Sequence, residues 1–105
     1  MADDRLTEDG LTAEVVARLA ATPDPRLREI MQAAVRHLHA FAKEVRLTDE
    51  EWFAGIRFLT ATGQKCDDVR QEFILLSDTL GLSSLIDIIN HSHVEEMSTE
   101  TTILG

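Results

Sequence analysis

Apolar side chains recur at every third or fourth position between residues 25 and 45, which places them along one face of a helix. Asp24 can accept hydrogen bonds from the first free amides, and Pro25 fits the first helical position, where a missing N–H costs nothing. The pattern predicts a helix of about five turns with an apolar stripe, formed by Leu27, Ile30, Met31, Ala34, Leu38, Phe41, Ala42 and Val45. Four polar residues lie away from this stripe: Arg28, Gln32, His39 and Lys43.

Shorter helices are predicted on both sides of the long one. The first begins with Thr12 as its N-cap, carries apolar residues on one face and stops at Pro23. Another begins at Thr48, whose hydroxyl can accept from the Glu51 amide while the Glu51 carboxylate reaches back to the Thr48 amide. Gly63 is placed to end this helix.

Two further helices are expected in the last part of the chain. One of the two aspartates at positions 67 and 68 is the expected N-cap of a helix that ends at Gly81. A serine at position 83 or 84 opens the final helix, which is expected to run to about His91. From Ser92 onward the chain is rich in Ser, Thr and Glu and has no helical period, so an extended segment is predicted.

The fold class is therefore all-α, a small bundle of about five helices with an extended C-terminal linker. Residues 1–10 are acidic and poor in apolar side chains, which is typical of a mobile arm. The helical domain is expected over residues 11–92 and the linker over residues 93–105.

Two features do not fit a bundle that buries all its apolar surface. On the fourth helix, Ile74 and Leu75 fall off the local apolar stripe, and Asp78 lies roughly 60° around the helix from Leu75. The fifth helix is apolar on most sides, through Leu82, Leu85, Ile86, Ile88 and Ile89. Such a helix must be covered on most sides, by a missing domain, by a second subunit or by the bundle itself.

Composition narrows the function classes. The chain has 105 residues and a formal net charge of −9, which argues against nucleic acid as a partner. No apolar run is long enough to span a membrane, and the N-terminus does not resemble a secretory signal. The lone Cys66 cannot form an internal disulfide, which favours a reducing, cytoplasmic compartment.

Motifs for catalysis or metal binding are weak. The four histidines form two H-x-H pairs. His37 and His39 lie in the middle of a helix, where residues two apart are about 200° apart and cannot share a metal ion, and His91 and His93 lie at a helix end. Asp87 could assist His91 as a ligand, although such pairs are common on solvated helices. Cys66 is followed by two aspartates, a poor setting for a nucleophile. We therefore expect no catalytic residue, no metal ligand and no cofactor within this chain.

The segment from Arg57 to Gly81, RFLTATGQKCDDVRQEFILLSDTLG, carries a resemblance to a known family. Together with HLHAFAKEVRLTDEEW before it and LSSLIDIINHS after it, it resembles the N-terminal helical region of intradiol ring-cleaving dioxygenases. Within that group it is most similar to hydroxyquinol 1,2-dioxygenases and next to catechol 1,2-dioxygenases. The resemblance covers roughly residues 24–105 and includes TTILG, which looks like the family's junction segment.

The resemblance implies a role without chemistry of its own. In that family the helical region builds a twofold homodimer interface with an apolar channel that commonly holds a phospholipid. Ferric iron is bound by two tyrosines and two histidines of the following β-domain, and this chain contains no tyrosine. The positions that match Leu75, Asp78 and Ile103 line the substrate pocket from the helical side.

On this interpretation residues 11–92 form a dimerisation domain, and residues 93–105 lead toward a catalytic β-domain that the chain lacks. The wide apolar stripe of the long helix, including Ala34, Leu38 and Phe41, is the expected dimer or lipid face. The alternative is a stand-alone helical interaction or lipid-binding module without catalysis. A third interpretation is an acidic helical domain with no specific role.

Overall fold

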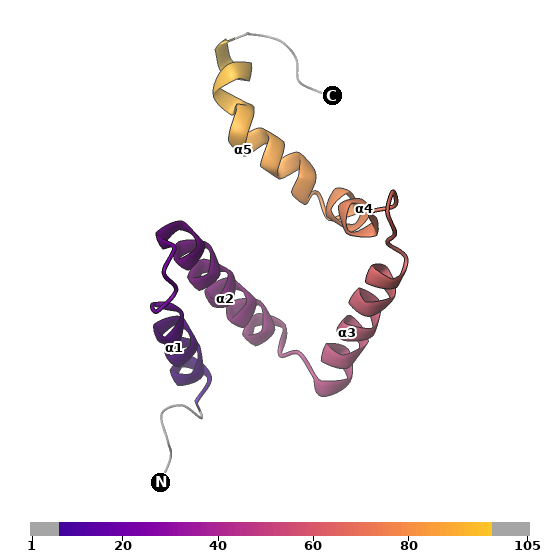
Figure 1. Cartoon of the computed structure of the whole chain (residues 1–105). Helices are drawn as coiled ribbons and strands as arrows, with labels where there is room; N and C mark the ends of the chain where they lie inside the picture. The colour runs from indigo at the N-terminus through magenta and orange to yellow at the C-terminus, as the bar shows by residue number, and fades with distance from the viewer. Residues whose placement is uncertain (1–6, 98–105) are drawn as a thin grey trace. The chain divides into compact units, whose positions relative to one another are not determined.

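The computed structural model describes residues 7–97, with side chains described through His91. Five α-helices follow one another in this range (Figure 1): α1 Glu8–Leu19, α2 Pro25–Val45, α3 Asp49–Gln64, α4 Glu72–Thr79 and α5 Leu82–Met97. The described residues contain no strand, which confirms the all-α prediction. The chain divides into two compact units, Met1–Trp52 and Phe53–Gly105, with the boundary in the first turn of α3.

The predicted start of α2 is confirmed. Asp24 is its N-cap, and one carboxylate oxygen accepts from the Arg26 amide at 2.9 Å and the Leu27 amide at 3.3 Å. Pro25 occupies the first helical position. At the other end Arg46 adopts left-handed backbone geometry with φ 52°, which turns the chain and stops the helix.

The capping box at the start of α3 is also confirmed. The Thr48 hydroxyl accepts from the Glu51 amide at 3.1 Å, and the Glu51 carboxylate accepts from the Thr48 amide at 3.0 Å. Two amides that the helix cannot pair internally are satisfied by this exchange.

Thr48→Ala is therefore expected to destabilise the fold by about 0.5–2 kcal/mol, because one cap acceptor is lost. Circular dichroism during thermal unfolding should show a lower midpoint. The matched control is Thr60→Ala at an exposed position inside α3, where alanine favours the helix and no midpoint loss is expected. Equal loss in both variants would mean that the box does not anchor α3.

The start of α1 differs from the prediction. The helix begins at Glu8 with Thr7 as its N-cap, whose side chain accepts from the Gly10 amide at 2.9 Å. Thr12, the predicted cap, lies inside the helix, and residues 8–10 of the predicted arm are helical. Thr7 is the better start because two acids, Glu8 and Asp9, then occupy the first turn beside the positive end of the helix dipole.

The start of α4 is a second correction. The helix begins at Glu72, and Gln71 is its N-cap. Asp67 instead accepts from the amides of Val69 at 2.9 Å and Arg70 at 2.8 Å, so it closes a turn before the helix. The hydrogen bond from the Val69 amide, and after it the one from Arg70, hold the pKa of Asp67 below its usual value.

The end of α4 follows its glycine signal, whereas α3 continues one residue past Gly63 to Gln64. Gly63 lies in the last turn of α3, and a side chain added there would come within 3.6 Å of the Phe73 ring. After α4 and its C-cap residue Leu80, Gly81 takes a φ of +80°, which residues with a side chain rarely adopt.

The end of α5 is a third correction. The helix continues to Met97, beyond the predicted end near His91 and into the predicted linker. The extra residues lack an apolar period, but none of them is glycine or proline, so nothing local stops the helix. The rest of the predicted linker, with Ile103, lies outside the described residues, as do residues 1–6 of the predicted arm.

Packing among the described residues is open. None of their side chains is fully buried, so the described part of the chain has no closed hydrophobic core. In the described range no helix is both long and apolar enough to cross a membrane.

Candidate functional site

In the first unit, α1 lies against the polar side of α2. Gln32 donates from Nε2 to the Val16 carbonyl at 2.9 Å, and Arg28 donates from Nε to the Thr22 carbonyl at 3.2 Å. His39 Nδ1 lies 2.6 Å from the Thr12 hydroxyl oxygen. Polar residues that lie off the apolar stripe therefore contact α1 and the segment after it.

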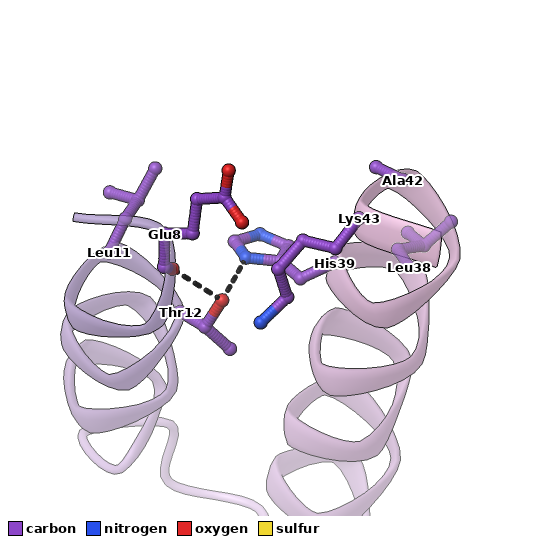
Figure 2. A pocket seen from close by; sticks show the side chains of 7 residues that line it. All are labelled: Glu8, Leu11, Thr12, Leu38, His39, Ala42 and Lys43. Atoms are coloured by element: carbon purple, nitrogen blue, oxygen red, sulfur yellow. Dashed lines mark hydrogen bonds between the residues drawn. The ribbon is translucent and has the colours of Figure 1, made fainter. Parts of the chain in front are cut away.

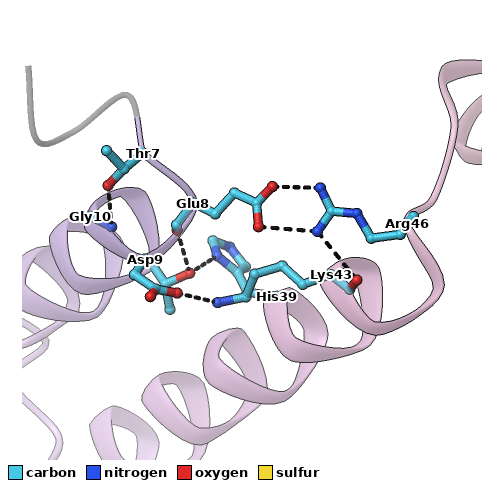
Figure 3. Close-up of polar contacts among 8 residues, drawn as sticks. Thr7, Glu8, Asp9, Gly10, His39, Lys43 and Arg46 are labelled. Carbon is cyan, nitrogen blue, oxygen red and sulfur yellow. Dashed lines mark hydrogen bonds and ion pairs between the residues drawn. The ribbon is translucent and has the colours of Figure 1, made fainter. Parts of the chain in front are cut away.

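Two ion pairs extend these contacts at the N-terminal end of α1 (Figure 3). Arg46 donates to both carboxylate oxygens of Glu8, at 2.6 and 3.1 Å, and Lys43 donates to Asp9 at 2.8 Å. The Arg46 hydrogen bond lowers the pKa of Glu8, and the Lys43 hydrogen bond lowers that of Asp9. Below, "the α1 clasp" means the contacts of Glu8, Asp9 and Thr12 with His39, Lys43 and Arg46. The sequence does carry a signal for the clasp: acids at the start of α1 and bases at the end of α2 have opposite charge. This signal was missed because residues 1–10 were assigned to a mobile arm.

The apolar stripe of α2 lies roughly 120° around the helix from the side that α1 covers. Its large side chains remain 39–64% exposed, and Leu38 is the most exposed of them. Ala34 and Phe41, the other residues predicted for a dimer or lipid face, are exposed as well. Within the first unit, α1 therefore leaves this face open.

A shallow cleft of about 270 Å³ lies between α1 and α2 (Figure 2). Leu38 lines it from the edge of the stripe, and the Thr12–His39 contact crosses it. The lining residues are Glu8, Leu11, Thr12, Leu38, His39, Ala42 and Lys43. The cleft thus connects the α1 clasp with the exposed stripe.

In the second unit, Leu75 lies at a cleft of about 250 Å³ between α3 and α4. Leu75 is 56% exposed, and the other lining residues are Phe58, Thr62, Glu72, Leu76 and Thr79. Asp78 lies one turn further along α4, is exposed, and its side chain makes no hydrogen bond to another described residue. The structure therefore presents Leu75 and Asp78 on one helix, both open to a partner surface.

The apolar character of α5 is visible as exposed surface. Its five large aliphatic side chains between Leu82 and Ile89 are 49–62% exposed, although α5 packs against α4. Ser77 and Ser83 also join these two helices, with their hydroxyl oxygens 2.7 Å apart. Ile74 of α4 is similarly exposed.

Among residues 7–91 no group of three or more His, Cys, Asp and Glu side chains could hold a metal ion. His91 Nε2 lies 3.7 Å from an Asp87 carboxylate oxygen, as the sequence spacing suggested. Cys66 Sγ contacts the Thr62 carbonyl at 3.6 Å and Gln71 Oε1 at 3.4 Å, and both neighbours are acceptors. These contacts do not assemble a nucleophile with a base.

Comparison with known proteins identifies the arrangement. The family described as "Catechol dioxygenase N terminus" matches residues 24–98, from the N-cap of α2 to just beyond α5. The chain belongs to this family. The match confirms the resemblance seen in the segment from Arg57 to Gly81, and α1 precedes the matched region.

Relatives of this dioxygenase N-terminal domain include enzymes of both expected types. A 6-chlorohydroxyquinol 1,2-dioxygenase of Cupriavidus pinatubonensis is 58% identical over 93% of this chain and 35% of its own length. A catechol 1,2-dioxygenase of Candida albicans is 35% identical over 90% of the chain and 31% of its own length. The solved hydroxyquinol 1,2-dioxygenase of Pseudomonas putida DLL-E4 is 62% identical with a TM-score of 0.78, over 80% of this chain and 30% of that one.

The chain spans about a third of the length of the curated relatives it matches. It corresponds to the N-terminal domain of intradiol hydroxyquinol and catechol dioxygenases.

Proposed function

We propose that this domain dimerises and flanks the substrate in an enzyme that cleaves hydroxyquinol between adjacent hydroxyl-bearing carbons. The observation that carries the proposal is the pair Leu75 and Asp78 on the open surface of α4. Similarity to hydroxyquinol 1,2-dioxygenases at 62% identity supports the choice of substrate.

Leu75 and Asp78 supply two different contacts for a substituted aromatic ring. The Leu75 side chain can cover apolar ring carbon, while the Asp78 carboxylate can accept a hydrogen bond from a further hydroxyl. The Asp78 carboxylate makes no hydrogen bond to another described residue and is exposed to water. A substrate hydroxyl could therefore donate to it in place of water. Ile103 is proposed to join them, by resemblance to the family.

The ferric iron of the family does not fit the residues of this chain. The sequence has no tyrosine, and residues 7–91 hold no metal-binding cluster. The iron ligands, and with them the oxygen chemistry, are therefore proposed to come from the catalytic domain. This chain contributes substrate contacts and the assembly of the enzyme.

The dimer is proposed to form through the apolar stripe of α2, with Ala34, Leu38 and Phe41 in the interface. The support is the exposure of this stripe on the side that α1 leaves uncovered. A phospholipid is proposed as a further occupant of the same apolar face.

The single thiol, Cys66, supports a reducing cytoplasmic setting.

The second candidate function is a stand-alone helical module that binds lipid or another protein. The exposed aliphatic side chains of α5 favour it. Native mass spectrometry separates the two: a stoichiometric lipid on a monomer supports the module, and a dimer supports the dioxygenase domain.

The test is to assay the purified 105-residue chain and a chimera in which it replaces the matching N-terminal segment of the Pseudomonas putida enzyme. The chain alone is expected to be colourless and inactive, and the chimera is expected to consume hydroxyquinol. The control is the remaining part of that enzyme without any N-terminal segment. A tyrosinate–iron absorption band or ring cleavage in the isolated chain would overturn the proposal, as would a folded, iron-loaded chimera without activity.

A further inference from the structure

We propose that α1 is an electrostatic latch on α2, held at its first turn by salt bridges whose loss frees the N-terminal half of the helix and opens the cleft lined by Leu38. The inference concerns the first unit alone and is independent of the enzymatic assignment.

The contacts between α1 and α2 change in kind along the hairpin. At the N-terminal end of α1 they are ionic: Glu8 with Arg46, and Asp9 with Lys43. Toward its C-terminal end Gln32 donates to the Val16 carbonyl, and Arg28 donates to the Thr22 carbonyl in the segment after α1. Both ion pairs are solvent-exposed, so salt can screen them, whereas the contact of Gln32 is part-buried and neutral.

The Thr12–His39 contact marks the boundary between the two halves of α1. The Thr12 hydroxyl oxygen lies 3.2 Å from the Glu8 carbonyl oxygen and 2.6 Å from His39 Nδ1. The two ion pairs lie beyond this contact, toward the N-terminus of α1. The release is therefore assigned to the ion pairs.

Release of the first turn of α1 would open the cleft, because the walls of the cleft come from both helices. Glu8, Leu11 and Thr12 supply the α1 wall, and Leu38 and Ala42 are on the α2 wall. If the first turn of α1 lifts away, Leu38 and Ala42 lose the cover that these side chains give. Access to one edge of the apolar stripe thus depends on ionic strength.

Acid should open the latch by the same route. Both carboxylates have lowered pKa values, because of Arg46 for Glu8 and Lys43 for Asp9. Their contribution is complete above their usual pKa values and is lost as pH falls through the lowered ones. The ionisable groups that face the two carboxylates are Arg46, Lys43 and His39, and the hydrogen bond to Glu8 raises the pKa of Arg46. The latch is therefore closed at neutral pH and opens in acid.

The test is hydrogen exchange of the backbone amides of residues 11–15 and 16–19 in the 105-residue chain. In the wild type, about 1 M NaCl is expected to speed exchange over residues 11–15 by a few-fold, with little change over residues 16–19. The variant Lys43→Gln/Arg46→Gln should show the fast exchange already at low salt and should lose most of the salt response.

These substitutions are placed on α2 because neutralising Glu8 and Asp9 would also weaken α1 through its dipole. The matched control is Arg26→Gln/Glu29→Gln, which removes an exposed ion pair within α2 and should leave α1 exchange unchanged. Salt-insensitive exchange in the wild type, or an unchanged profile in the Lys43→Gln/Arg46→Gln variant, would overturn the latch. So would an effect of the control equal to that of the α2 variant.

Discussion

Leu38→Glu is expected to dissociate the proposed dimer without unfolding the helices. Leu38 is the most exposed side chain of the apolar stripe, at 64%, so only a small part of it is covered within the first unit. In a twofold dimer the substitution occurs twice, and each lost large apolar contact costs about 1.5–3 kcal/mol. Since each 1.4 kcal/mol of lost binding free energy raises a dissociation constant tenfold, that of the dimer should rise by about 100-fold or more.

Sedimentation velocity across a concentration series would measure this change, with circular dichroism as the check on folding. The matched control is Arg36→Glu, which places the same carboxylate at an exposed position on the opposite side of α2. The control variant should remain dimeric. A folded Leu38→Glu protein with the wild-type dissociation constant would place the interface elsewhere.

Asp78→Ala is expected to erode a preference for hydroxyquinol over catechol in the chimeric enzyme. Catechol has no further hydroxyl, so its bare ring would leave the Asp78 carboxylate facing carbon without a donor. An unpaired acceptor costs about 1–3 kcal/mol, and each 1.36 kcal/mol is tenfold in rate. Loss of the carboxylate should therefore reduce the ratio of specificity constants by roughly 10–100-fold.

Steady-state kinetics with both substrates would measure that ratio, so that general damage to the enzyme cancels. Asp68→Ala is the control, because it removes an exposed acid from the turn before α4. An unchanged ratio in Asp78→Ala would make Asp78 a surface acid without a part in substrate choice.

Helix boundaries were predictable where residues next to the boundary determine it by themselves. Asp24 with Pro25, the Thr48–Glu51 box and Gly81 act through bonds or angles within a few residues, so the sequence identifies them. Prediction failed where two local solutions compete. Asp67 can cap a helix or close a turn, and it closes the turn.

The start of α1 was missed for a different reason. An acidic stretch with few apolar residues is typical of a mobile arm, but Glu8 and Asp9 find Arg46 and Lys43 more than thirty residues away. Thr12 likewise contacts His39 instead of capping the helix. Such pairs depend on which side of α2 the first helix covers, and the apolar pattern alone does not give that side.

The candidate site was predictable only in part. The position of Leu75 off the local stripe indicated an open face on α4, and the structure has it exposed at a cleft. The function of that face could come only from resemblance, because the described residues show no partner surface for it. The exposure of α5 has the same physical reason: its apolar sides have too few neighbours within the second unit.

The most direct measurement is the ratio of kcat/KM for hydroxyquinol to kcat/KM for catechol in two chimeras built on the Pseudomonas putida enzyme. One carries this chain, and the other carries the matching segment of the Candida albicans catechol 1,2-dioxygenase. Our account predicts a ratio roughly 10–100-fold higher in the first, because Asp78 is proposed to accept the third hydroxyl of hydroxyquinol. Equal ratios in two folded, iron-loaded chimeras would contradict a substrate-flanking role for this domain.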